Sequence, residues 1–157
     1  MNRRINITIN KAYVFNDVDE TAAYIGAKTV GDDGAYERVF TTDADRTLLE
    51  NFWSEACVTA TQRLKPFIIE ASDSAVSHTV SLEQNYEVTL SMPSSFEEAL
   101  ANNITTSLYH YFVYAIVSKW CRLASKADAE SYAIDAANML NEAMRVVYHR
   151  KRPQRPM

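Results

Sequence analysis

An apolar side chain at every fourth position across the C-terminal third of the chain constrains the fold more than any other feature. The members of this repeat are Phe96, Leu100, Ile104, Leu108, Phe112, Ile116 and Trp120. An α-helix has about 3.6 residues per turn, so a strict spacing of four drifts around it, and Val113, Val117 and Leu123 widen the stripe. The pattern predicts a helix over about residues 95–123, roughly 43 Å long at 1.5 Å per residue.

A second helical pattern follows almost at once. Ser125 with Asp128 three residues later resembles a capping box. One face of the helix beyond it carries Tyr132, Ala136, Leu140, Met144 and Val147. We expect a helix over about residues 126–150. Because only about three residues connect the two helices, they must be antiparallel neighbours that form a long hairpin.

The first helix of this hairpin carries the clearest start signal in the chain. Ser94 and Ser95 are followed by Glu97 and Glu98, as in a capping box. Neighbours on a helix point about 100° apart, so these two carboxylates are poorly placed to act on one substrate as an acid–base pair. We interpret them as residues that favour a helix N-terminus.

The N-terminal part predicts a strand and two helices. Residues 5–9 alternate isoleucine with polar residues, which indicates a half-buried strand. Residues 16–19 resemble a cap for a short helix that ends at Gly26, and residues 29–37 have the composition of a loop.

Thr42 and Asp45 resemble a capping box for a helix over about residues 43–64, which ends before Pro66. Residues 67–71 are a candidate strand. The alternation that includes Val80 and Leu82 indicates a hairpin or one long strand over residues 78–92.

Together these elements predict a mostly helical α+β fold. A long antiparallel helical hairpin (about 95–123 and 126–150) is joined by the helix at about 43–64 and a small β element, because the strands do not alternate with crossover helices. The length of 157 residues suits a single domain. We expect that domain over residues 1–149, followed by a basic, proline-containing tail over 150–157.

Glycine is scarce, and this excludes several classes of site. The chain has three glycines, Gly26, Gly31 and Gly34, and none over residues 35–157. Phosphate-binding loops, dinucleotide-binding turns and the strained turn of a nucleophile elbow all need glycine at set spacings. Those three glycines fit none of these spacings, so nothing in the sequence predicts a cofactor.

Charge is distributed unevenly along the chain. Residues 1–144 hold eleven Lys and Arg against twenty Asp and Glu, a net charge of −9. The remaining residues hold five cations and no acid: Arg145, Arg150, Lys151, Arg152 and Arg155. An acidic body with a basic end predicts contact with DNA or with an acidic protein surface. The alternative is a solubilising tail whose first cations suit a helix C-terminus.

The apolar pattern and the cysteine count indicate the cellular compartment in which the protein is made. Cys57 and Cys121 fall within helical patterns and predict no disulfide framework. No apolar run reaches the roughly eighteen residues of a membrane span, and residues 5–10 alternate unlike the continuous apolar core of a signal peptide. We therefore expect a protein made in the cytoplasm that has no membrane partner.

No constellation of catalytic or metal-binding residues is predicted. His110 and Cys121 lie on a similar helix face, but eleven residues separate them by roughly 16 Å along the axis, too far to share a zinc ion. The aromatic cluster of this helix includes Tyr109, Tyr111 and Tyr114 outside the main stripe. We interpret these tyrosines as a subunit interface, with burial in the monomer's own core and base stacking as alternatives.

Two stretches of the chain carry a resemblance. One is Phe40–Arg46, continuing through Phe52-Trp53 to Leu64–Phe67, and the other joins Ser118-Lys119-Trp120 to Tyr148–Pro153. They resemble uncharacterised proteins of prophage structural-gene clusters in Bacteroides-type gut bacteria. The overall plan is similar to the head–tail connector, or neck adaptor, proteins of tailed phages.

The resemblance implies a non-enzymatic virion protein, assembled in the bacterial host cytoplasm. Such a protein forms a homo-oligomeric ring around the DNA channel and contacts portal and tail or neck proteins. The alternative is a small nucleic-acid-binding or packaging accessory protein that uses the basic C-terminal tail, and an enzyme is a third hypothesis. Affinity for duplex DNA that falls steeply as salt rises would separate a dedicated DNA binder from a connector.

Overall fold

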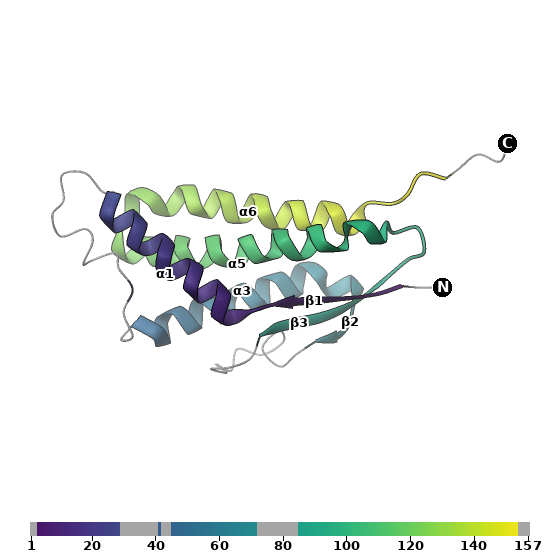
Figure 1. Cartoon of the computed structure of the whole chain (residues 1–157), viewed down its shortest axis with the longest axis horizontal. Helices are drawn as coiled ribbons and strands as arrows, with labels where there is room; N and C mark the ends of the chain where they lie inside the picture. Colours follow the sequence, from purple (N-terminus) through teal and green to yellow (C-terminus); the bar gives the residue numbers. More distant parts are fainter. Residues whose placement is uncertain (1–2, 29–40, 42–44, 72–84, 154–157) are drawn as a thin grey trace.

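The structure is a computed structural model, and it describes residues 3–28, 41, 45–71 and 85–153. Within these residues four α-helices accompany one three-stranded antiparallel sheet (Figure 1). The predicted mostly helical α+β fold is confirmed. The loop expected at 29–37, the capping role of Thr42 and the strand residues Val80 and Leu82 lie outside the described residues.

The long helical hairpin is confirmed. It consists of α5 (Ala101–Ala124) and α6 (Lys126–Tyr148), which pack side by side along their length (Figure 1). Only Ser125 separates them, so the connection is shorter than the three residues expected. The hydroxyl of Ser125 donates to the Asp128 carboxylate at 2.9 Å, and the Asp128 N–H donates to the Ser125 carbonyl at 3.1 Å.

Helix α5 lies at the centre of the molecule and also packs against α1, α3 and β1. Its apolar stripe is buried from Ile104 to Trp120, as the spacing predicts. Burial extends to Tyr111, Val113 and Val117, because neighbouring elements cover several sides of this helix. Leu123 was expected to widen the stripe, but it is 65% exposed at the end of the helix.

The start of α5 differs from the prediction. The segment before it forms a turn in which the Phe96 N–H donates to the Pro93 carbonyl at 2.9 Å, and a 3₁₀ turn, η3 (Glu98–Leu100), leads into the helix. No side chain caps α5 at its N-cap, Leu100. The expected capping box is therefore wrong. Burial of Phe96 holds the turn against the core. The Glu97 carboxylate lies 3.2 Å from His149 Nε2, and the Glu98 carboxylate lies 2.8 Å from Arg3.

The sheet has the order β1-β3-β2, with β1 (Arg3–Ile9), β2 (Ile68–Ala71) and β3 (Tyr86–Met92). Strands β1 and β3 pair antiparallel with Ile5 opposite Leu90 and Ile9 opposite Tyr86. The alternate residues of both strands that face α5 are buried, which confirms the predicted alternation. Strand β2 pairs with β3 through a register shift between Ile68 and Glu70.

Helix α1 (Lys11–Lys28) begins earlier and ends later than predicted. The Asn10 side chain accepts a hydrogen bond from the Tyr13 N–H at 3.1 Å, so Asn10 caps the helix directly after β1. The expected cap at residues 16–19 lies inside the helix. Gly26 is also inside it, buried rather than placed at the C-terminus.

Helix α3 (Arg46–Leu64) confirms the helix expected at about 43–64. It ends before Pro66 and continues as a 3₁₀ turn, η2 (Lys65–Phe67), into β2. Its N-cap is Asp45, whose side chain makes no capping hydrogen bond to the first turn of α3. The capping box predicted for Thr42 with Asp45 involves Thr42, which lies outside the described residues. Buried Trp53 packs between the rings of Phe15 and Phe112, with centroids 6.1 and 4.9 Å away.

Candidate functional site

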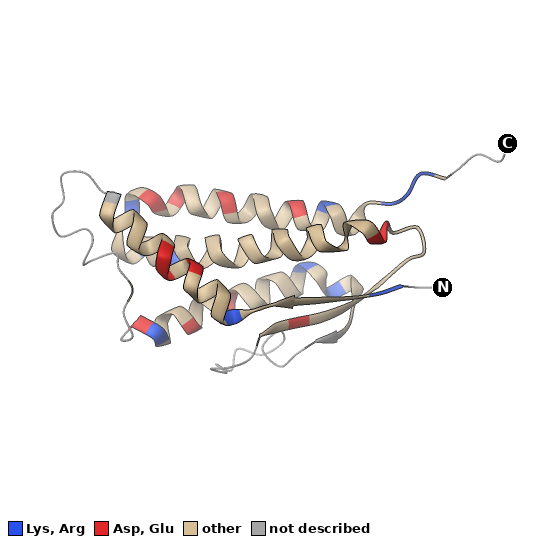
Figure 2. Ribbon diagram, viewed as in Figure 1, with Lys and Arg blue, Asp and Glu red and all other residues tan. Residues whose placement is uncertain are grey.

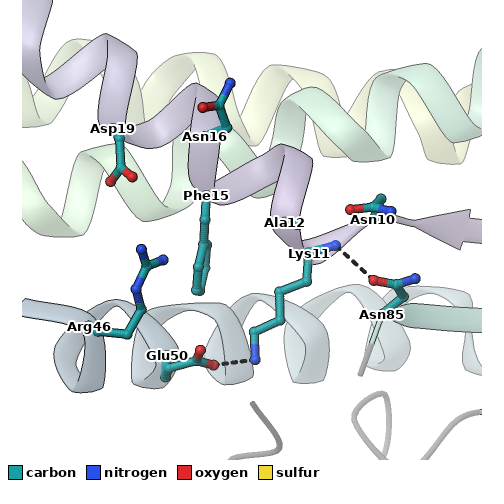
Figure 3. A pocket seen from close by; sticks show the side chains of 9 residues that line it. All are labelled: Asn10, Lys11, Ala12, Phe15, Asn16, Asp19, Arg46, Glu50 and Asn85. Carbon is teal, nitrogen blue, oxygen red and sulfur yellow. Dashed lines mark hydrogen bonds and ion pairs between the residues drawn. The ribbon is translucent and has the colours of Figure 1, made fainter. Parts of the chain in front are cut away.

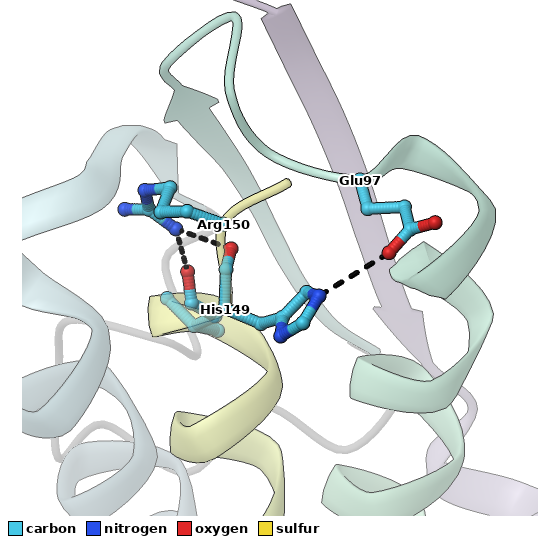
Figure 4. Close-up of polar contacts among 4 residues, drawn as sticks. Glu97, His149 and Arg150 are labelled. Carbon is cyan, nitrogen blue, oxygen red and sulfur yellow. Dashed lines mark hydrogen bonds and ion pairs between the residues drawn. The ribbon is translucent and has the colours of Figure 1, made fainter. Parts of the chain in front are cut away.

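The basic residues at the end of the chain do not all behave as a free tail. Arg145 lies in the last turn of α6, is exposed, and forms an ion pair with Glu142 one turn earlier. Arg150 Nη1 donates to the carbonyl oxygens of Val147 at 2.7 Å and His149 at 2.8 Å (Figure 4). Arg150 therefore satisfies carbonyls at the end of α6.

The turn before α5 holds this end of α6 in place. His149 Nε2 lies 3.2 Å from the Glu97 carboxylate (Figure 4), and the Lys151 N–H donates to the Ser95 carbonyl at 2.7 Å. Contact with the body thus extends to Lys151, two residues beyond the expected domain boundary at residue 149. Arg152 and Pro153 are exposed beyond it, and Arg155 lies outside the described residues.

Cations from other elements join this end of the molecule. Arg3, at the start of β1, forms an ion pair with Glu98 at 2.8 Å. Arg63, near the end of α3, donates to Asn141 on α6 at 3.1 Å. Both chain termini extend from this end (Figure 1), and Figure 2 shows basic residues on the elements that meet there.

We call Arg3, Arg4, Arg63, Lys65, Arg145, Arg150, Lys151 and Arg152 the basic end. The sequence pattern indicates only the C-terminal members, because the others form two short groups, Arg3-Arg4 and Arg63 with Lys65, far from them along the chain. Their convergence depends on antiparallel packing of α5 and α6 and on the pairing of β1 with β3.

The three tyrosines predicted as an interface lie in different environments. Tyr111 is 7% exposed and packs edge-on against Phe112, so the monomer's own core covers it. Its assignment to a subunit interface is therefore wrong, because it offers little surface to another chain. Tyr109 is half-buried and its hydroxyl donates to the Asp17 carboxylate, which ties α5 to α1. Tyr114 is half-buried beside Tyr132, with ring centroids 6.1 Å apart.

Burial also affects the acidity of these phenols. It raises the pKa of Tyr111 above the ordinary value for tyrosine. Burial and, after it, the hydrogen bond to Asp17 raise the pKa of Tyr109. An ordinary tyrosine is already neutral near pH 7, so the raised pKa values extend to higher pH the range in which both phenols stay protonated and can donate.

A cavity of about 620 Å³, lined mostly by polar and charged residues, lies between the N-terminal halves of α1 and α3 (Figure 3). Its lining is formed by Asn10, Lys11, Ala12, Phe15, Asn16, Asp19, Arg46, Glu50 and Asn85. The Asn85 side chain accepts a hydrogen bond from the Lys11 N–H at 3.1 Å, and Arg46 lies over the Phe15 ring at 5.0 Å. Two cations, Lys11 and Arg46, and two acids, Asp19 and Glu50, line the cavity, so the charges of its lining cancel.

The charged pair at the base of this cavity is buried. Lys11 and Glu50, 4% and 3% exposed, form an ion pair between α1 and α3 (Figure 3). The Lys11 ammonium also lies 5.6 Å from the Phe15 ring centroid and 6.0 Å from that of Trp53. Ion pairing and the two aromatic faces offset the desolvation of the ammonium group. This arrangement joins two helices, and sequence patterns gave no signal for it.

The two thiols are buried and poorly suited to nucleophilic chemistry. Burial raises the pKa of Cys57 to about 12, against a smaller opposing effect of the Lys11 ammonium. Burial and the Asp128 charge raise the pKa of Cys121 to about 11. A thiolate is the reactive form of cysteine, so neither side chain is activated here.

The described residues contain no group of three or more His, Cys, Asp or Glu side chains placed to hold a metal ion. In the same part of the chain, each helix is too short or too polar to cross a bilayer. Comparison of the chain with models of protein families, with curated proteins and with solved structures finds no match.

Proposed function

We propose that this chain is a phage virion structural protein, a head–tail connector or neck adaptor that forms a ring around the DNA channel. The observation that carries the proposal is the convergence of cations at one end of an otherwise acidic body. That end holds Arg152 beyond the last anchored residue, Lys151. A cationic surface suits passing DNA or the acidic face of a neighbouring protein.

The architecture supports the same proposal. A connector needs a stable body that presents a terminal segment to its neighbours. Helix α5 supplies this body, because it packs against α6, α1, α3 and β1 at once. As a virion component, the protein would be assembled in the cytoplasm of a bacterial host, with portal and tail or neck proteins as partners.

Measurement of the oligomeric state tests the proposal. We expect sedimentation velocity and mass photometry to show a cyclic oligomer at high protein concentration or on a portal-like template. Replacing Arg152 and Arg155 with glutamine should weaken that oligomer. Arg122→Gln with Lys126→Gln is the matched control, because it removes two exposed cations from the other end of the hairpin. A protein that stays monomeric at every concentration and within an assembled particle would overturn the proposal.

The second candidate is a nucleic-acid-binding or packaging accessory protein. The presence of Arg3, Arg4, Arg63 and Lys65 beside the C-terminal cations favours it, because these side chains enlarge the cationic surface. A dedicated DNA binder holds a short duplex at physiological salt and loses affinity by about 0.9 logarithmic units per phosphate contact for each tenfold rise in salt. Fluorescence anisotropy with a short duplex between about 0.05 and 0.2 M salt distinguishes this behaviour from the weak binding expected of a connector.

A further inference from the structure

A groove lined by tyrosines and acids lies between α1 and the hairpin, apart from the basic end. It has a volume of about 570 Å³ and is lined by Glu20, Thr21, Tyr24, Tyr114, Tyr132 and Asp135. Its residues come from α1, α5 and α6. Because α1 and α6 both pack against α5, the groove belongs to the stable body. We call these six residues the tyrosine groove.

The chemistry of the tyrosine groove suits a cation. Glu20 and Asp135 are exposed acids, and none of the six lining residues is a lysine or arginine. Tyr24, which lines the groove, is 63% exposed. A guanidinium group can bind a carboxylate and stack on an aromatic face at the same time, so arginine fits this surface better than lysine does.

The chain carries such a group at its own C-terminus. Arg152 is exposed and lies directly beyond Lys151, whose N–H is held by the Ser95 carbonyl. Arg152 precedes Pro153, which favours an extended backbone at Arg152. Figure 1 shows this segment leaving the body at the end away from the C-terminal half of α1.

Arg152 lies too close to the end of α6 to reach the groove of its own chain. Asp135 lies thirteen residues before Tyr148, the last residue of α6, which is about 20 Å along the helix. From Lys151 to Arg152 the extended backbone advances only about 3.5 Å. The length of the Arg152 side chain does not cover the rest of the distance back to Asp135. A contact between Arg152 and the tyrosine groove must therefore join two copies of the chain.

We propose that the tyrosine groove of one copy binds the C-terminal segment of the next, with Arg152 between the aromatic faces and the carboxylates of Glu20 and Asp135. The proposal rests on the ring assembly proposed above and names its contact. Groove and segment are different surfaces, so the contact is heterologous, and its repetition closes a ring or continues as a filament. It also brings the basic end of one copy to an acidic surface of its neighbour.

Disulfide trapping tests this contact in the full-length protein. One chain carries Thr21→Cys in the groove and a second carries Gln154→Cys in the C-terminal segment, so that Arg152, Glu20 and Asp135 all remain. Ser131→Cys, exposed one turn before Asp135 on α6, replaces Thr21→Cys if the half-buried Thr21 site does not tolerate the change. The native Cys57 and Cys121 are buried and do not compete. Ala137→Cys, exposed on α6 outside the groove, is the matched control.

We expect mild oxidation of the mixed chains to yield a disulfide-linked dimer with Thr21→Cys and only background with Ala137→Cys. Adding Glu20→Gln and Asp135→Asn to the Thr21→Cys chain should lower the yield several-fold. Equal yields with Ala137→Cys, or an internally bridged monomer when one chain carries both Thr21→Cys and Gln154→Cys, would overturn the contact.

Sedimentation of the unmodified protein separates this proposal from the proposed function. A ring that forms without the specific cross-link overturns the groove contact and leaves the connector function standing. A strict monomer, in solution and in particles, overturns the connector function. Specific trapping of the dimer at high concentration supports the groove contact, whether or not the unmodified protein sediments as a ring.

Discussion

Lys11, the first residue of α1, forms a buried ion pair with Glu50 in the second turn of α3. The pair joins two helices that flank the polar cavity, and the rings of Phe15 and Trp53 lie close to the ammonium group. Burying one charge without its partner is far more costly than burying the matched pair. The pair therefore makes the position of α1 depend on α3.

Removing one member of this pair should destabilise the protein strongly. We expect Lys11→Met to lower the free energy of unfolding by about 3–5 kcal/mol, because it leaves the Glu50 carboxylate buried without a counter-charge. The double variant with Glu50→Leu should recover most of that loss, because an apolar pair needs no charge compensation. Urea unfolding followed by circular dichroism measures both.

The exposed ion pair between Lys119 and Glu55 provides the control. Lys119→Met should change the free energy of unfolding by less than about 1 kcal/mol, because solvent screens this pair. A cost for Lys11→Met as small as that of the control would contradict the role given to the buried pair.

Trp120 tests the packing of the hairpin. Trp120→Ala should cost about 3–5 kcal/mol, because it removes a large side chain that is only 6% exposed and leaves a cavity. Leu123→Ala, one turn later on the exposed side, should cost less than about 0.5 kcal/mol. Chemical denaturation of both variants gives the comparison. Similar losses for the two would show that the orientation of α5 about its axis is wrong.

The buried thiols should make the protein less stable at alkaline pH. The Cys57 pKa rises from 9.0 to about 12 on folding, so above about pH 9 the unfolded chain releases a proton that the folded chain retains. The stabilisation is complete below pH 9 and is lost as pH rises toward 12. From pH 8 to pH 10 we expect a loss of roughly 1 kcal/mol from this thiol.

Urea unfolding of the native protein and of Cys57→Ala across this pH range measures the effect. The variant starts from a lower stability because it leaves a small cavity, but its stability should fall less steeply with pH. Identical slopes for the two proteins would show that Cys57 ionises in the folded state as readily as in the unfolded state.

We expect the residues of the C-terminal segment up to Lys151 to stabilise the fold and those after Lys151 to act only in assembly. Deleting residues 152–157 should leave the melting temperature nearly unchanged and impair oligomer formation. Deleting residues 150–157 should also cost about 1 kcal/mol, because it removes the hydrogen bonds that Arg150 and Lys151 make to backbone carbonyls. Thermal unfolding and sedimentation of both truncations test the division. Equal melting temperatures for the two would contradict a structural role for Arg150 and Lys151.

Local patterns were enough to predict the helices and strands in which burial repeats every few residues. The stripe from Ile104 to Trp120 and the face from Ala136 to Val147 specify two helices, because one face of each has to be buried. Pro66 marked the end of α3, and alternation marked β1 and β3. The cluster of cations in the C-terminal segment could also be recognised from the sequence. In each case the decisive interactions join residues a few positions apart, which periodicity and capping rules describe.

The partners of many polar side chains, by contrast, depend on how the helices and strands pack against one another. Glu97 and Glu98 have the spacing of a capping box, yet they pair with His149 and Arg3, which packing brings beside them. The ion pair of Lys11 with Glu50 and the tyrosine groove likewise join residues from separate helices. Such contacts depend on how helices cross and which faces they cover, and a one-dimensional pattern carries no information about either.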